Sequence, residues 1–288
     1  SCIPCPPLDS PSFGLIQEKF ADNPFHLLLV VYFLNKTKGT AAIPSFFSLI
    51  ERYPTAEDLA HASEADITEM IKPLGLQNIR SRNIVIFAKK WVSDPPQAGK
   101  RYRTLNYPRV GDGRDIKRDE IVADNAEDPR EGAFEIGHLP ICGPYARDSW
   151  RIFCRDVQRG IADGWNGEGR SGMFEPEWKR VVPSDKELRA FLRWMWLREG
   201  WDWDPLTGEK KVASSEVLDK AKQGDAEWVD PDEGTSKQQG DKNAALALAR
   251  EDRAPCETIG EARDSRAARL RPNSTKKIVV VEIDAPPR

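Results

Sequence analysis

Helix-start and helix-stop signals recur along residues 13–203 and constrain the fold of this chain more than any other feature. Asn23-Pro24 is typical of a helix cap followed by proline at the first helical position, and residues 25–34 are apolar on nearly every side, as in a buried helix. The pattern therefore predicts an all-α core. Further helices are expected over 40–53, from capping-box-like starts at Thr55 and Ser63, and over 78–91, 145–159 and 185–199.

The segments around this core have a different composition. Residues 1–12 are rich in proline and are expected to be disordered, while two loop insertions, at about 93–133 and 160–176, are polar and carry many glycines. Residues 204–288 contain few aromatic side chains and many charged ones, which predicts a disordered tail. Within that tail, 243–253 is a candidate transient helix and 276–283 a candidate docking peptide for a protein partner.

Charge and cysteine content narrow the class of protein without identifying it. Charged residues make up 31% of the 288 residues, but the net charge is only −3, so the chain lacks the strongly basic balance of many nucleic-acid-binding domains. Helix N-termini and local patches can bind nucleic acid without that balance. Of the five cysteines, only Cys2 and Cys5 are closely spaced, and no second ligand pair accompanies them, so no metal site is expected.

Targeting signals are weak in this sequence. No apolar run reaches the length of a membrane span, so no membrane partner is expected. The chain starts at Ser1 without a basic region before an apolar one, so no signal peptide is expected, and reduced thiols inside a cell are the default. Because no initiator methionine is present, the sequence is interpreted as a fragment or a trimmed chain.

Two short segments have the composition of a site for chemistry on a nucleotide. Residues 139–146 read Leu-Pro-Ile-Cys-Gly-Pro-Tyr-Ala, which predicts a tight turn whose backbone N–H groups can hold a phosphate. Residues 182–185 read Val-Pro-Ser-Asp and place a carboxylate where an apolar helix begins. Each has a structural alternative: a plain helix–helix turn for the first, and a helix cap at Ser184 or Asp185 for the second.

The order of several further strings resembles that of a known family. They are Phe-Leu-Asn-Lys-Thr at 33–37, Ala-Ile-Pro at 42–44, Tyr-Pro-Thr-Ala-Glu at 53–57, Lys-Pro-Leu-Gly-Leu at 72–76 and Asp-Ser-Trp-Arg-Ile-Phe-Cys at 148–154. Together with 139–146 and 182–185, they are similar to the helix-hairpin-helix DNA glycosylases, and within these to the glycosylase domain of the methyl-CpG-binding thymine glycosylases. The resemblance covers about 13–198 and implies a two-lobed, all-α fold with the active site between the lobes.

The resemblance also implies catalytic roles for Asp185 and Tyr145. Asp185 would stabilise the oxocarbenium-like sugar as the base departs and would orient the attacking water. A carboxylate at a helix N-terminus is expected to stay ionised near neutral pH. Tyr145 stands where bifunctional relatives carry a Schiff-base lysine, and a phenol cannot form that adduct, so no lyase activity is expected. Tyr145 would contact the extruded base; its alternative is a core aromatic residue.

DNA and base contacts are implied in the same way. Leu139, Cys142 and Gly143 belong to the phosphate-binding hairpin, whose carbonyl groups are a possible site for a monovalent cation. Lys36 and Leu76 would fill or probe the duplex after a nucleotide is extruded. Gln17 would read the Watson–Crick edge of a pyrimidine, since its amide both donates and accepts. A buried turn residue is the alternative for Leu76, and an exposed helix residue that for Gln17.

The chain departs from the family pattern at several places. Ile141 stands where relatives usually carry glycine, and Lys36 where they usually carry arginine. Tyr145 and Asp185 are about forty residues apart instead of about twenty, so Asp163 and Glu177 are second candidates for the catalytic carboxylate. The four-cysteine iron–sulfur motif of some relatives is absent, and no cofactor is expected.

The resulting expectation is a monomeric, monofunctional DNA glycosylase acting on thymine or uracil opposite guanine in double-stranded DNA, within base-excision repair. A nuclear location follows from that function and not from a targeting signal. Two alternatives remain open: a non-catalytic DNA-binding module with a degenerate site, and an interaction platform whose function lies in the tail.

Overall fold

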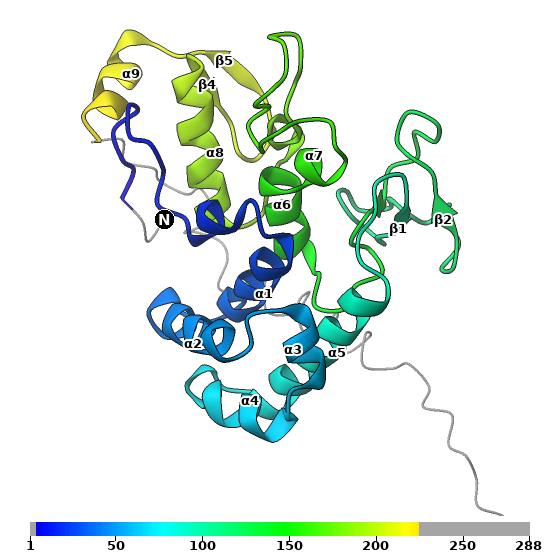
Figure 1. Ribbon diagram of the computed structural model, residues 1–288. Coiled ribbons are helices and arrows are strands. Elements are labelled where there is room, and N and C mark those ends of the chain that lie inside the picture. The colour runs from blue at the N-terminus through cyan, green and yellow to red at the C-terminus, as the bar shows by residue number, and fades with distance from the viewer. Residues whose placement is uncertain (1–3, 225–288) are drawn as a thin grey trace, which may run out of the picture. The chain divides into compact units, whose positions relative to one another are not determined.

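The computed structural model describes residues 4–224, which belong to one compact unit (Figure 1). Helices dominate it, as the sequence pattern predicts. They are η1 (Ile16–Phe20), α1 (Pro24–Leu34), α2 (Gly39–Arg52), α3 (Ala56–His61), α4 (Glu64–Met70), η2 (Lys72–Leu74), α5 (Gln77–Ser93), α6 (Pro144–Phe153), α7 (Arg155–Gln158), η3 (Glu177–Arg180), α8 (Lys186–Arg198) and α9 (Ser215–Lys222).

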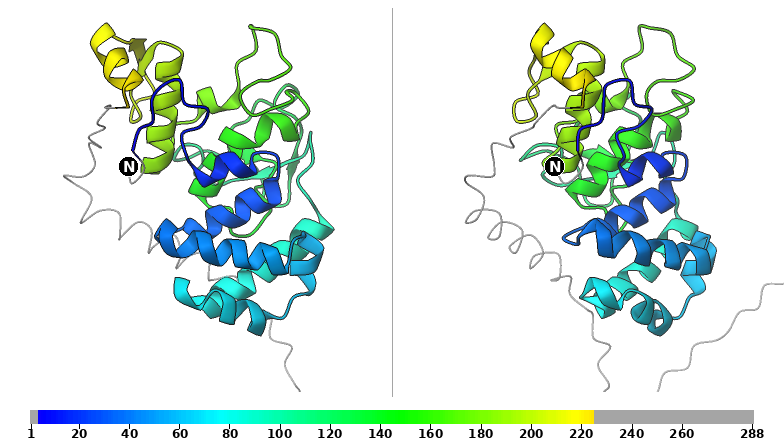
Figure 2. Two further views of the ribbon diagram at one scale, coloured as in Figure 1. Left: turned by 60° about the vertical axis from the view of Figure 1, so that its left-hand side comes forward. Right: turned by 90° about the vertical axis from the view of Figure 1, so that its left-hand side faces the viewer.

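Helix α1 lies between two groups of helices and packs against both. On one side it contacts α2, and α3 and α4 pack against α5; on the other side it contacts α6. The two groups stay separate in all three views, α2–α5 in blue to cyan and α6–α9 in green to yellow (Figures 1 and 2). Because both faces of α1 are covered, its side chains from Leu27 to Val31 are buried, which explains why its sequence shows no polar face.

The caps that start several helices agree with the sequence, with one exception. The Asn23 side chain accepts a hydrogen bond from the His26 backbone N–H, and Thr55 and Asp58 form a reciprocal capping box. Ser63 holds the N-cap position of α4, but its side chain makes no cap bond there. The capping box expected at Ser63 is therefore wrong, and its would-be partner Asp66 pairs instead with Arg52 at 3.2 Å.

The first insertion contains a small sheet, whereas the sequence indicated only a surface loop. Strand β1 (Arg101–Arg103) pairs antiparallel with β2 (Ile121–Val122) and with β3 (Ala133–Phe134). The buried Arg101 guanidinium holds it together by donating to the backbone carbonyls of Ala123, Asp128 and Arg130. These strands are too short to show a period-2 pattern, and a polar side chain organises them, so the hydrophobic pattern carries no signal.

The boundaries of the folded part also extend beyond those expected. Residues 4–12 are ordered: Cys5 is buried and the Trp194 indole donates to the Pro7 carbonyl at 3.3 Å. After Trp203 the chain continues through the hairpin of β4 (Trp201–Trp203) and β5 (Lys210–Val212) into α9, which packs on α8. The remaining expected tail, including 243–253 and 276–283, lies outside the described residues, as do Cys2 and Cys256.

Candidate active site and DNA-binding face

Asp185 caps helix α8 with one of its two carboxylate oxygens. Oδ1 accepts from the backbone N–H groups of Glu187 at 2.9 Å and Leu188 at 3.1 Å. The cap thus uses Oδ1 alone, and Oδ2 takes no part in it. Burial raises the pKa of Asp185 above its ordinary value, while the two N–H bonds lower it. The structural and catalytic interpretations of Asp185 are therefore compatible, because they use different oxygens of one carboxylate.

Tyr145 and Gln17 form a hydrogen-bonded pair close to this carboxylate. The Gln17 amide nitrogen donates to the Tyr145 hydroxyl at 2.8 Å, and the negative charge of Asp185 acts together with burial to raise the pKa of Tyr145. Gln17 is 1% exposed, so it is not the exposed helix residue considered as its alternative. Its amide oxygen is buried without a hydrogen-bond partner. A buried acceptor of this kind is costly unless a ligand satisfies it.

A second buried carboxylate, Asp148, lies one helical turn after Tyr145 on α6. Its Oδ1 accepts from the Tyr107 hydroxyl at 2.7 Å, and both side chains are buried. Burial raises the pKa of Asp148 to about 6, the Tyr107 hydrogen bond lowers it, and the charge of Asp185 raises it. Neither Asp148 nor Tyr107 was among the site residues predicted from the sequence. Asp148 could have been predicted from its three-residue spacing from Tyr145, which places both side chains on one face of a helix. Tyr107 lies in an insertion, and no sequence pattern indicated that it reaches the site.

The hairpin places its residues in two different environments. Leu139 and Cys142 are buried, and burial raises the pKa of the Cys142 thiol to about 12, so these two positions can reach DNA only through their backbones. Gly143 is exposed and forms the N-cap of α6, where no side chain caps the helix. The first N–H groups of α6 are therefore open to an anion such as a phosphate.

Ile141, which replaces the glycine usual in relatives, adopts a left-handed backbone conformation with φ of 64°. For a β-branched residue this is a strained conformation, costing on the order of 1–3 kcal/mol. The carbonyl of Ile141 accepts from the Gly143 N–H at 3.1 Å, which closes the turn. The strain at Ile141 identifies the hairpin as a candidate functional segment.

Lys36 and Leu76 stand on neighbouring turns of the other helix group. Both have positive φ, 56° and 52° respectively, and Leu76 is 70% exposed, so it is not a buried turn residue. Arg80 of α5 fastens the turn that carries Lys36, because it donates to the Asn35 carbonyl at 3.0 Å and to the Thr37 hydroxyl at 2.9 Å. An exposed leucine at the tip of a turn is suited to insertion into a duplex.

The two second-choice carboxylates occupy other environments. Asp163 is exposed within the second insertion and outside the pocket described below. Glu177 is buried, and its Oε1 accepts from Arg151 at 2.6 Å and from Arg155 at 2.8 Å. Two guanidinium partners engage this one oxygen, so Glu177 is a structural ion-pair residue. Asp185 is the better candidate of the three.

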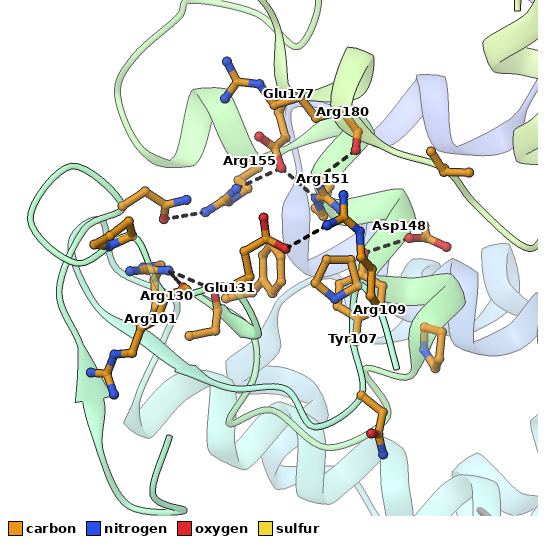
Figure 3. Close-up of a pocket in the computed structure, with 18 of the residues that line it drawn as sticks. Arg101, Tyr107, Arg109, Arg130, Glu131, Asp148, Arg151, Arg155, Glu177 and Arg180 are labelled. Atoms are coloured by element: carbon orange, nitrogen blue, oxygen red, sulfur yellow. Dashed lines mark hydrogen bonds and ion pairs between the residues drawn. The ribbon is translucent and has the colours of Figure 1, made fainter. Parts of the chain in front are cut away.

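A pocket of about 690 Å³ lies between the first insertion and α6, and Figure 3 shows its lining. Pro144 and Asp148 of α6 and Ser184 beside Asp185 contribute to it, so it adjoins the candidate active site. Six arginines also line it. Arg151 and Arg155 bond to Glu177, and both stand over the Phe134 ring at 5.2 and 4.8 Å. This buried network attaches the insertion to α6 and α7.

Within residues 4–224, no group of three or more His, Cys, Asp or Glu side chains is placed to hold a metal ion. Cys5, Cys142 and Cys154 are buried and take part in no disulfide bond. Over the same residues, no helix combines the length and the apolar character that crossing a bilayer requires.

Comparison with known proteins places the chain in a family. The family described as HhH-GPD superfamily base excision DNA repair protein matches residues 34–214. Because the match covers more than half of the chain, this protein belongs to the HhH-GPD superfamily. It is also similar to a thymine-DNA glycosylase of Aeropyrum pernix, with 30% identity over 67 residues, which are 23% of this chain and 30% of that relative. The chain thus matches about a third of the length of this curated relative.

Proposed function

We propose that this protein is a monofunctional DNA glycosylase that hydrolyses the N-glycosidic bond of thymine or uracil mispaired with guanine, in base-excision repair. The observation that carries the proposal is the group formed by Asp185, Tyr145 and Gln17. In this group Asp185 has one carboxylate oxygen outside the helix cap. Gln17, which donates to Tyr145, has a buried amide oxygen without a hydrogen-bond partner. Thymine and uracil both present an N3–H donor on the Watson–Crick edge, which matches that amide oxygen.

In the proposed reaction the target nucleotide leaves the stack and its base enters the site beside Tyr145 and Gln17. The bond between C1′ of the sugar and N1 of the base breaks, and the base keeps the electron pair. Asp185 Oδ2 faces the positive charge that develops on the sugar, which lowers the barrier because the carboxylate is already in place. Water then adds to C1′ and gives up one proton by way of the carboxylate, the departed base takes up one proton at N1, and an abasic site and neutral free base result.

Base release from labelled duplexes tests this function. The purified chain is incubated with G·T, G·U, A·T and 8-oxoguanine·A duplexes, and abasic sites are cleaved with alkali. We expect strand breaks from G·T and G·U only after alkali, because Tyr145 carries no amine for a Schiff base. Breaks without alkali, or a protein–DNA adduct trapped by borohydride, contradict the monofunctional assignment. Tight binding with no release from any duplex instead supports a degenerate DNA-binding module.

The pH dependence of base release gives a second test, which concerns Asp185 directly. The reaction needs the ionised carboxylate, so the rate falls as pH drops through the raised pKa of Asp185. Glu187 raises that pKa and Lys186 lowers it by charge. Glu187→Gln is therefore expected to move the acid limb of the rate profile to lower pH, and Lys186→Met to higher pH, each by less than about one unit. The measurement is the single-turnover rate of each variant against pH. Shifts of both variants in the same direction, or none, contradict the role of Asp185.

A further inference from the structure

The first insertion carries a loop, residues 105–113, that displays an arginine and a valine to solvent beside the candidate active site. Arg109 has a side chain that is 80% exposed, and Val110 is 90% exposed. The loop tip thus presents a cation and a small apolar surface side by side. The sequence and the family comparison assign no role to this loop.

Internal hydrogen bonds keep the loop rigid. The backbone N–H of Asn106 donates to the Asp112 carbonyl at 2.9 Å, and the Asp112 carboxylate accepts from the Arg109 N–H at 2.9 Å. At its base, Gly132 lies so close to Gly113 that a Cβ at Gly132 would overlap the Gly113 backbone. The backbone at Arg109 and Val110 is thus set before any ligand arrives, which lowers the entropy cost of binding one.

The loop is also attached to α6, the helix that carries Tyr145. Tyr107, two residues before Arg109, donates its hydroxyl proton to Asp148 of α6, and the Arg147 guanidinium stands over the Tyr107 ring at 5.5 Å. Figure 3 shows Tyr107 directed at Asp148 and Arg109 directed at Glu131 across the pocket. A ligand bound at Arg109 would therefore adjoin the α6 N-terminus at Pro144, which lines the same pocket.

Arg109 is better placed to accept a new anion than the other arginines deep in the pocket. Arg101, Arg151 and Arg155 are buried and committed to carbonyl or carboxylate partners. Arg109 forms a long ion pair with Glu131, with 3.8 Å between the nitrogen and the oxygen, and both side chains are well exposed. Such a surface pair contributes little, about 0–1 kcal/mol, so a phosphate that offers two oxygens to the guanidinium can replace it.

Backbone conformation links this loop to the proposed DNA contacts. Among the described residues, four non-glycine residues have positive φ. They are Lys36, Leu76, Ile141 and Asn106. The first three belong to the proposed DNA-binding turns, and the fourth begins the loop. Asparagine adopts this conformation readily, whereas at Lys36, Leu76 and Ile141 it stores strain of the kind found at ligand sites.

We propose that loop 105–113 is an additional DNA-binding element, in which Arg109 binds a backbone phosphate of the duplex held by the hairpin and Val110 packs against the adjacent sugars. The choice of DNA as the partner rests on the proposed function. The contact carries no sequence information, because a phosphate is the same at every base pair. The loop would add a phosphate contact beside the pocket, in a chain whose net charge of −3 does not favour DNA binding.

Binding measured apart from catalysis tests this proposal. Affinities for matched and G·U duplexes are measured by fluorescence anisotropy over a salt series, in an Asp185→Asn background in which base release is expected to be about 10²- to 10⁴-fold slower. Arg109→Ala is expected to weaken binding about three- to tenfold, equally for both duplexes, and to reduce the slope of log affinity against log salt by about one. Arg109→Lys keeps the charge and is expected to recover part of the affinity.

The matched control is Arg118→Ala, which removes an exposed arginine of the same insertion that does not line the pocket. It is expected to leave affinity and salt slope unchanged. Equal affinities and slopes for Arg109→Ala and Arg118→Ala overturn the proposal. The proposed function can fail separately: a wild-type chain that releases no base still yields these affinities, and a selective loss at Arg109 then supports the DNA contact alone.

Discussion

Replacing Asp185 by asparagine is expected to lower the rate of base release by about 10²- to 10⁴-fold while the protein stays folded and still binds duplex DNA. Asparagine is a more specific test than alanine, because it removes the charge of Asp185 without removing the helix cap. The cap of α8 uses only Oδ1, and an asparagine carbonyl oxygen can accept the same bonds from Glu187 and Leu188. Asparagine therefore removes the negative charge and keeps the cap. Single-turnover release from a G·U duplex measures the loss.

Two companion variants separate the catalytic role of Asp185 from its structural one. Asp185→Ala loses both charge and cap, so it is expected to be destabilised by a further ~1 kcal/mol without being less active than Asp185→Asn. Glu175→Gln, at an exposed carboxylate paired with Arg180, is the matched control and is expected to keep wild-type rates. Near-wild-type release by Asp185→Asn, with Asp185→Ala impaired only in stability, would show that Asp185 is a helix cap and nothing more.

Replacing Glu177 by alanine is expected to destabilise the protein by about 3–5 kcal/mol, which corresponds to a fall in Tm of about 6–20 °C. Burial alone would raise the pKa of Glu177, but Arg155 and Arg151 more than offset this, so the carboxylate is ionised and its pKa lies below the ordinary value. Without it, two buried guanidinium groups keep their charge and lose their shared acceptor. Thermal unfolding followed by circular dichroism measures the change.

Glu175→Ala is the matched control for this prediction as well. Glu175 is two residues away and about half exposed, and its ion pair with Arg180 at 3.3 Å faces solvent. Its loss is expected to change stability by less than about 0.5 kcal/mol. Glu177→Gln, which keeps the volume and one acceptor oxygen, is expected to fall between the two. An unchanged Tm for Glu177→Ala would mean that the arginines find other partners or water.

The helical core was predictable because its signals are local. Caps such as Asn23 and Thr55 satisfy N–H groups a few residues away, and the unbroken apolar run of α1 reflects burial on both faces. The position of Asp185 could be predicted for the same reason, since a carboxylate directly before an apolar helix indicates a helix start in any fold. Its catalytic interpretation needed the resemblance, because a cap alone says nothing about chemistry.

What the sequence pattern missed depends on contacts between distant segments. The sheet of the first insertion is held by the Arg101 guanidinium across about thirty residues, and the Tyr107–Asp148 hydrogen bond spans 41 residues. Neither has a periodic or local signature. Neighbours remote in the chain likewise determine how exposed a side chain is. They leave Leu76 and Arg109 exposed and bury Gln17.

The sequence by itself thus determined the order of the helices, their caps and the position of one carboxylate at the start of α8, because these follow from interactions within a few residues. Only the tertiary structure decided that Gln17, Tyr145 and Asp185 meet, that Glu177 is bound between two arginines, and that the first insertion packs against α6 beside the site. Those outcomes depend on which surfaces the packed helices bring together, and the desolvation and charge pairing at these surfaces exist only after folding.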